Sequence, residues 1–271
     1  MQRILAHAGV ASRRAAEQFI LDGRVAINGE TVTTLGTKAN PATDEIRVDG
    51  KVLRVESPRH LMLNKPKGYI TTTSDERGRL TVMDLVTASE RIYPVGRLDR
   101  DTEGLLILTN DGELANRIMH PRFGLEKEYE VLTSIYPSPD QLRRLRSGPT
   151  VDKHRVVPSD ARVQRETSNG VILRVVIREG TNHVVRKMMS ALDIPVTSLR
   201  RTRIGPLSLA GIPSGQYRDI RPGELGSLVE ALGFDEDDGQ GETRPHAAAQ
   251  SGSHQLKPSK SSNSTRQDID S

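Results

Sequence analysis

The densest group of acidic side chains lies in the segment Gly96-Arg97-Leu98-Asp99-Arg100-Asp101-Thr102-Glu103-Gly104, where three carboxylates alternate with other residues. This spacing allows three interpretations. The acids can form a solvated face of an extended segment that the two arginines neutralise. They can bind a hard cation through their oxygens. One of them can act as a nucleophile that a nearby cation keeps ionised. The residue types alone leave all three open.

Several other kinds of catalytic site are absent from the sequence. It contains no cysteine, which excludes disulfides, thiolate metal sites and cysteine nucleophiles. It has no G-x-x-x-x-G-K-[ST] phosphate loop, no H-E-x-x-H pair and no G-x-S-x-G elbow. No G-x-G-x-x-G follows a predicted strand, and the seven histidines are far apart. We therefore expect neither a dinucleotide site nor a metal site.

The charge is unevenly distributed along the 271 residues, whose formal net charge is +4 and whose pI is about 9.4. Residues 235–271 hold seven acids, four bases and no aromatic residue, so we expect a disordered acidic and polar tail. The basic remainder favours a polyanionic partner. No apolar run is long enough to span a membrane and no signal core is evident, so we expect a cytoplasmic protein without membrane contact.

Residues 1–56 predict a small domain of two helices and a few short strands. The helices are expected over 2–8 and 13–22, and Ser12 is a suitable N-cap for the second. Asn28-Gly29 between two short β-prone runs predicts a hairpin.

This pattern resembles the RNA-binding domain shared with small-subunit ribosomal protein S-four, the alpha-L motif. The resemblance covers residues 2 to about 50, in order and in spacing. It implies that six side chains lie on or near an RNA surface, where they would grip phosphates: Arg3, Ser12, Arg13, Arg14, Arg24 and Asn28. The alternative is ordinary solvated charge.

Residues 57–234 predict an α+β domain. Strands outnumber helices and no regular βαβ repeat is visible, which favours a mostly antiparallel mixed sheet. Strands are expected over 61–64, 104–109, 127–133, 170–178 and 195–204, and helices over 81–86, 111–120, 138–147, 182–192 and 223–232.

Four segments of this domain resemble the signature segments of pseudouridine synthases, in the RsuA/RluB-type ribosomal RNA branch. They are Leu63-Asn64-Lys65-Pro66-Lys67-Gly68-Tyr69, Pro94-Val95-Gly96-Arg97-Leu98-Asp99-Arg100-Asp101-Thr102-Glu103-Gly104-Leu105-Leu106, Thr109-Asn110-Asp111-Gly112 and Met119-His120-Pro121. With the first domain, the resemblance covers about residues 2–230. It implies isomerisation of a ribosomal uridine to pseudouridine, and the segment from Gly112 to Pro121 is more similar to the RluB-like, large-subunit enzymes.

The resemblance also implies roles for single residues. Asp99 is the expected nucleophile, Tyr129 is expected to lie against the target base, and Arg186 is expected to pair with Asp99. Lys65 and Arg97 are expected to contact RNA. Two of these roles are compatible with the local pattern. Arg186 lies at the margin of its helix's apolar stripe, and Tyr129 faces inward on its strand. The alternatives are an ordinary surface arginine and a core tyrosine.

The implied reaction needs a uridine flipped out of its helix, because the glycosidic bond is otherwise out of reach. Asp99 could add to C1′, add to C6 of the base, or remove a C2′ proton. No cofactor is required, because atoms are only rearranged. Two other hypotheses stand beside this one: a non-catalytic RNA-binding ribosome-assembly factor, and a metal-dependent nuclease that uses the three acids. We expect a monomer that acts on ribosomal RNA, either naked or within an assembly intermediate.

Overall fold

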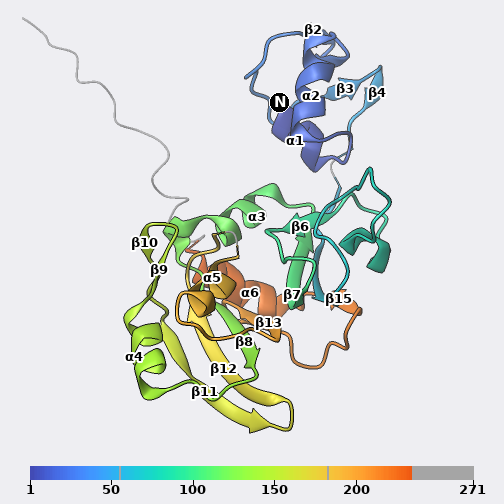
Figure 1. Cartoon of the computed structure of the whole chain (residues 1–271). Helices are drawn as coiled ribbons and strands as arrows, with labels where there is room; N and C mark the ends of the chain where they lie inside the picture. Colours follow the sequence, from blue (N-terminus) through green and yellow to red (C-terminus); the bar gives the residue numbers. More distant parts are fainter. Residues whose placement is uncertain (55, 182, 234–271) are drawn as a thin grey trace, which may run out of the picture. The chain divides into compact units, whose positions relative to one another are not determined.

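The computed structural model describes residues 1–54, 56–181 and 183–233 (Figure 1). The predicted tail and Asn182 lie outside the described residues. Within them, no helix has both the length and the apolar character needed to cross a bilayer. The helices are α1 (Gln2–His7), α2 (Arg13–Leu21), α3 (Gly112–Met119), α4 (Pro139–Ser147), α5 (Val184–Ser190) and α6 (Pro222–Ala231), with 3₁₀ turns at Val82–Leu85 and Pro121–Phe123.

The strands belong to one small sheet, one hairpin and one large sheet. The small sheet has the order β2-β1-β3-β4, the hairpin is β9-β10, and the large sheet has the order β11-β12-β8-β13-β7-β5-β15, with β14 beside β13 and β6 beside β7. Their bounds are β1 (Val25–Ile27), β2 (Glu30–Val32), β3 (Ile46–Val48), β4 (Lys51–Val52), β5 (His60–Lys65), β6 (Tyr93–Val95), β7 (Thr102–Thr109), β8 (Lys127–Thr133), β9 (Thr150–Val151), β10 (His154–Arg155), β11 (Asp160–Thr167), β12 (Gly170–Ile177), β13 (Ser198–Ile204), β14 (Leu207–Ser208) and β15 (Tyr217–Asp219).

The N-terminal helices and small sheet enclose a hydrophobic core of their own, which includes Leu5, Ile20 and Val25. The predicted cap is confirmed: the Ser12 hydroxyl accepts a hydrogen bond from the Ala15 amide at 3.2 Å. The predicted hairpin is confirmed as well, because β1 and β2 pair antiparallel around Asn28, whose φ is +50°.

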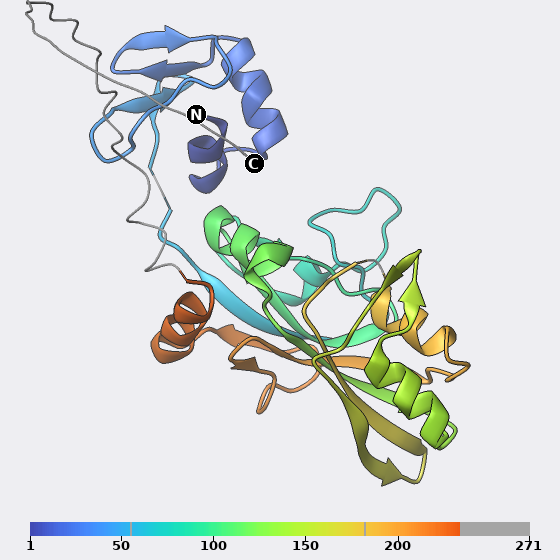
Figure 2. The same cartoon turned by 90° about the vertical axis from the view of Figure 1, so that its left-hand side faces the viewer.

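The large sheet confirms the expected α+β class. Its neighbouring strands are antiparallel except at one place, where β13 and β7 run parallel. Figure 2 shows this sheet running through the larger part of the chain, with helices packed against it. The mixed sheet therefore has a single parallel junction, between β13 and β7, among the described strands.

The half of the sheet formed by β11, β12 and β8 is amphipathic. Alternate residues of β12, such as Leu173 and Val175, pack with buried residues of α4 and α5. The intervening positions carry charge: Arg174 binds Glu128 of β8 at 2.7 Å and also pairs with Asp160 of β11. One face of this half is thus core and the other is a polar surface, as expected for an antiparallel sheet.

The half formed by β7 and β5 is buried on both faces, which explains the continuous apolar run of β7. Leu105 and Ile107 pack in a core shared with α3 and α6. Leu106 and Leu108 pack in another core, with residues of the long connection after β5.

The parallel junction depends on a glycine. Gly104 of β7 lies opposite Arg201 of β13, and its φ is +106°. A Cβ atom at Gly104 would lie 2.2 Å from the Arg201 carbonyl oxygen, so no other residue allows the two strands this approach.

We predict that Gly104→Ala lowers the free energy of unfolding by about 3 kcal/mol or more, because it adds both a backbone clash and strain at positive φ. Gly226→Ala is the matched control: Gly226 lies within α6, and a Cβ there meets no atom within 4 Å. The control should be neutral or stabilising by up to about 1 kcal/mol. Urea unfolding measures both, and equal stabilities would contradict the prediction.

Candidate active site

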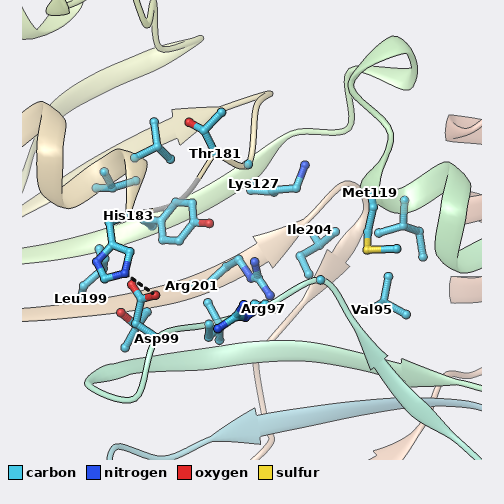
Figure 3. Close-up of a pocket in the computed structure, with 18 residues that line it drawn as sticks. Val95, Arg97, Asp99, Met119, Lys127, Thr181, His183, Leu199, Arg201 and Ile204 are labelled. Carbon is cyan, nitrogen blue, oxygen red and sulfur yellow. Dashed lines mark ion pairs between the residues drawn. The ribbon is translucent and has the colours of Figure 1, made fainter. Parts of the chain in front are cut away.

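A cavity of about 470 Å³ opens where the segment between β6 and β7 faces β8, β13 and the start of α5 (Figure 3). Its lining includes three residues singled out from the sequence: Arg97, Asp99 and Tyr129. This volume is within the range of small-ligand sites. The fold thus brings together residues that are up to 32 positions apart in the sequence.

Asp99 lies in a turn whose backbone carbonyls accept hydrogen bonds from the buried ammonium group of Lys65. Lys65, at the end of β5, is fully buried. Its Nζ donates to the carbonyl oxygens of Asp99 at 3.0 Å, Arg100 at 3.3 Å and Thr102 at 2.8 Å, and to that of Pro66 at 3.1 Å. Charge-assisted bonds of this kind are stronger than neutral ones.

Two further contacts fix the same turn. The Thr71 hydroxyl donates to the Leu98 carbonyl at 2.7 Å and accepts from the Leu98 amide at 3.2 Å. The Gly68 amide donates to the Arg100 carbonyl at 2.9 Å. The backbone on both sides of Asp99 is therefore held by the segment after β5, while its side chain remains accessible in the cavity.

The expectation that Lys65 contacts RNA is corrected by its position. Its side chain has no exposed surface, and its donors are used on backbone carbonyls. Burial lowers the pKa of Lys65 to about 8, against the opposing influence of Asp99, Asp101 and Glu103. Lys65 acts on the site through the position of Asp99.

The second correction concerns the basic side chain that lies beside the Asp99 carboxylate. Arg186 was expected to pair with it, but the Arg186 guanidinium donates to the Asp101 carbonyl at 3.1 Å and lines a neighbouring surface hollow. His183 lies beside Asp99 instead, with Nε2 3.3 Å from Oδ1. His183 takes a left-handed conformation, with φ +57°, directly before α5. That conformation, which the sequence pattern did not reveal, turns its ring toward the turn that carries Asp99.

Tyr129 faces inward, as predicted. It is 7% exposed, lies on β8 and lines the cavity. Its position on the strand is opposite Arg201 of β13, so the two side chains stand on the same face of the sheet. The tyrosine hydroxyl has no hydrogen-bond partner within the described part of the chain.

A basic part of the cavity was not anticipated from the sequence. Lys127 and Arg201 both line it, together with Asp99 and His183 (Figure 3). Burial, and to a smaller extent the positive charge of Arg201, lower the pKa of Lys127 to about 8. Two cations therefore share this part of the cavity.

The predicted RNA-contacting residues of the N-terminal unit, the helices and small sheet formed by residues 2–52, differ in their surroundings. Arg3 is exposed on α1, and Arg13 and Arg14 are exposed on the first turn of α2. Arg24 instead binds Asp49 through two hydrogen bonds, of 2.8 and 2.6 Å, and its guanidinium covers the Phe19 ring at 3.8 Å.

Asn28 also has an intramolecular role. Its side-chain oxygen accepts from the Glu45 amide at 2.9 Å, and its amide nitrogen donates to Asp44 at 3.1 Å. Asn28 therefore fixes the end of the hairpin, whereas Ser12 caps α2. The exposed cations Arg13 and Arg14 of α2 are the better candidates for phosphate contacts, because Arg3 of α1 pairs with Glu113 at 2.5 Å.

The three acids of the segment do not converge. Glu103 lies 3.6 Å from Lys67 and accepts a hydrogen bond from Ser198, while Asp99 faces His183. Within residues 1–54, 56–181 and 183–233, no three histidine, aspartate or glutamate side chains gather as metal ligands would. The arrangement that a two- or three-carboxylate nuclease needs is not formed there.

Comparison with known proteins agrees with this geometry. Residues 59–191 match the model of the RNA pseudouridylate synthase family, and residues 2–46 match that of the S4 domain. The chain is 42% identical to an uncharacterized RNA pseudouridine synthase of Aquifex aeolicus over 86% of this chain and 95% of that protein. It is 40% identical to the ribosomal large subunit pseudouridine synthase B of Bacillus subtilis, over 84% and 94%.

Two further matches extend this result. The chain is 32% identical to the dual-specificity RNA pseudouridine synthase RluF of Escherichia coli, over 92% of this chain and 83% of that protein. A crystal structure of a pseudouridylate synthase superposes with a TM-score of 0.60, at 28% identity, and covers 84% of this chain and 98% of that chain.

Replacing Lys65 should loosen the turn that carries Asp99. We predict that Lys65→Met lowers the free energy of unfolding by about 1–3 kcal/mol, because several backbone carbonyls lose their donor. Asp99 would then be displaced, and catalytic turnover should fall by about 100-fold. Thermal unfolding and a turnover assay measure the two effects. Lys67→Met, at an exposed lysine of the same segment, is the control and should change stability little.

Lys65 should also contribute to the pH dependence of stability. Its pKa is about 8 in the folded protein and about 10.4 in the unfolded chain. Between these values the unfolded state binds more protons, so this group makes the free energy of unfolding rise with pH, by at most about 1.4 kcal/mol per pH unit. Urea unfolding at several pH values should show that Lys65→Met loses this rise. A constant difference between the two proteins from pH 8 to about pH 10 would contradict the assigned pKa.

Proposed function

The chain belongs to the RNA pseudouridylate synthase family, and from that membership we propose that it converts one specific uridine of large-subunit ribosomal RNA to pseudouridine, with Asp99 as the nucleophile. The observation that carries the proposal is the accessible Asp99 carboxylate in a cavity that Tyr129 also lines, on a turn whose backbone carbonyls are bonded to Lys65. A nucleophile on a fixed backbone keeps its alignment with the substrate, which is a large part of catalysis.

The cavity suits a single flipped base. Its walls combine the Tyr129 ring with aliphatic side chains such as Leu199 and Val185. A base that leaves its helix needs such surfaces to replace the stacking that it loses. Arg97, exposed at the cavity, has no hydrogen bond or ion pair with the described residues and is suited to the RNA left behind.

The reaction rearranges bonds without a net change in composition. The N1–C1′ bond breaks, the uracil rotates, and a C5–C1′ bond forms. The proton on C5 is lost, and N1 gains a proton. Asp99 assists the first step as nucleophile, and His183, whose Nε2 lies 3.3 Å from Oδ1, orients its carboxylate. Arg186 is close enough to the same turn to contact RNA that approaches it.

The N-terminal unit supplies affinity for the RNA in this proposal. Its match to the S4 domain and the exposed Arg13 and Arg14 favour contacts with phosphates. The choice of large-subunit RNA rests on the relative in Bacillus subtilis, whose name states that activity. We propose that the chain acts as a monomer, on naked RNA or on an assembling particle.

The proposal is tested by tritium release from ribosomal RNA labelled at uridine C5. Wild-type protein should release tritium from large-subunit transcripts or particles in the presence of EDTA. Asp99→Asn should lose about 10⁴-fold or more in rate while it still binds RNA. Asp101→Asn is the matched control, because Asp101 lies on the same turn with its carboxylate exposed, and it should keep most of the activity.

Each other result has a definite meaning. Release from small-subunit RNA alone would reject the choice of subunit. Equal activity of Asp99→Asn and wild type would reject Asp99 as the nucleophile. Tight RNA binding without release from any transcript or particle would favour the non-catalytic assembly factor.

A further inference from the structure

Arg201, which lines the cavity, has a hydrogen-bond donor without an acceptor among the described residues. The Arg201 side chain is 5% exposed, and its Nε donates to the Leu105 carbonyl at 2.8 Å. Its Nη2 is buried and has no hydrogen-bond partner in the described residues. Buried polar atoms are rarely left in this state, because each one loses its bonds to water.

The charge around Arg201 is equally unbalanced. Asp99 is the only acid among the described residues that line the cavity, and its carboxylate lies beside His183, with Oδ1 3.3 Å from Nε2. Arg201 has no ion pair within residues 1–54, 56–181 and 183–233, and its positive charge acts on another cation of the lining, Lys127, whose pKa it helps to lower. Lysine can relieve this repulsion by losing a proton, but arginine cannot.

Thr102, on the neighbouring strand β7, repeats the pattern. It is 2% exposed, lines the same cavity, and its hydroxyl oxygen is buried without a partner in the described residues. Thr102 lies opposite Leu199 in the parallel junction, and Arg201 follows two residues later on the same face of β13. Two buried polar groups without a partner in the described residues thus line the same cavity, on the neighbouring strands β7 and β13.

The next question is which part of an RNA substrate could reach Arg201 and Thr102 inside the cavity. A ribose-phosphate chain remains at the mouth of a site that receives a flipped base, whereas the base enters the interior. The polar edge of uracil presents two carbonyl acceptors on either side of the N3–H donor. A guanidinium offers donors only, and a hydroxyl can accept, so the edge matches both orphan groups.

We propose that Arg201 binds a carbonyl oxygen of the flipped uracil, beside Thr102, whose hydroxyl accepts from N3–H. This inference rests on the proposed function. When the N1–C1′ bond breaks, its electron pair passes to the base, and the negative charge is shared by the carbonyl oxygens. Arg201 is then a preorganised positive group at the place where charge develops, which is among the strongest sources of catalysis.

The test compares four variants on the RNA that the wild-type protein modifies. Arg201→Met should lower kcat by about 10²–10³-fold, with a smaller change in RNA affinity, because phosphate contacts dominate binding. Arg201→Lys should recover part of this loss. Thr102→Val keeps the shape of the side chain and should lower kcat less. Arg200→Met, on the exposed face of the same strand, is the control and should keep the wild-type kcat.

A change in the substrate instead of the protein distinguishes a direct contact between Arg201 and the base from a purely structural role of Arg201. Sulfur accepts hydrogen bonds more weakly than oxygen, so RNA with 2-thiouridine or 4-thiouridine at the target should slow the wild-type protein with one of the two. Arg201→Met should show no additional slowing with that RNA. Equal slowing of both proteins, or a wild-type kcat for Arg201→Met, would overturn the inference.

A binding measurement separates this inference from the proposed function. Free uracil, titrated into the wild-type protein and followed by NMR, should perturb signals of the cavity, and Arg201→Met should abolish this effect. Uracil binding that depends on Arg201, without any pseudouridine formation, would uphold the inference and reject the proposed function. Pseudouridine formation with uracil binding that is unchanged in Arg201→Met would do the reverse.

Discussion

The ammonium group of Lys65 is the contact on which the site most depends. It replaces water for the carbonyl oxygens of Asp99, Arg100 and Thr102 in a place that solvent does not reach. Those carbonyls turn inward, so the Asp99 side chain is left to face the cavity. A single buried ammonium group thus fixes the backbone of the acid-rich segment that carries Asp99.

The cavity separates two kinds of electrostatic environment within a short distance. Asp99 lies beside His183, whereas Lys127 and Arg201 have no acidic partner within the part of the chain that the structure describes. Desolvation makes each of these charges more effective than it would be in water. The site is therefore asymmetric before any substrate arrives, and this asymmetry can orient a base that enters it.

Much of this fold could be predicted from the sequence, because periodicity and turn residues are local signals. Strand β8 and helix α4 lie where their patterns place them, and Ser12 caps α2 as expected. Strand β11 was missed because most of its side chains are exposed and polar, so it lacks an apolar period. The left-handed backbone of His183 and the burial of Lys65 and Arg201 depend on long-range packing, which no local pattern encodes.

The parallel junction of the large sheet has a mechanical consequence. Only three residue pairs join β13 to β7, from Leu199 with Thr102 to Arg201 with Gly104. The sheet therefore consists of two halves, β11-β12-β8-β13 and β7-β5-β15, which are joined by few hydrogen bonds and pack against separate cores. The cavity is lined by residues of both halves. A small change in the angle between the two halves would therefore widen or narrow the cavity without disrupting either core.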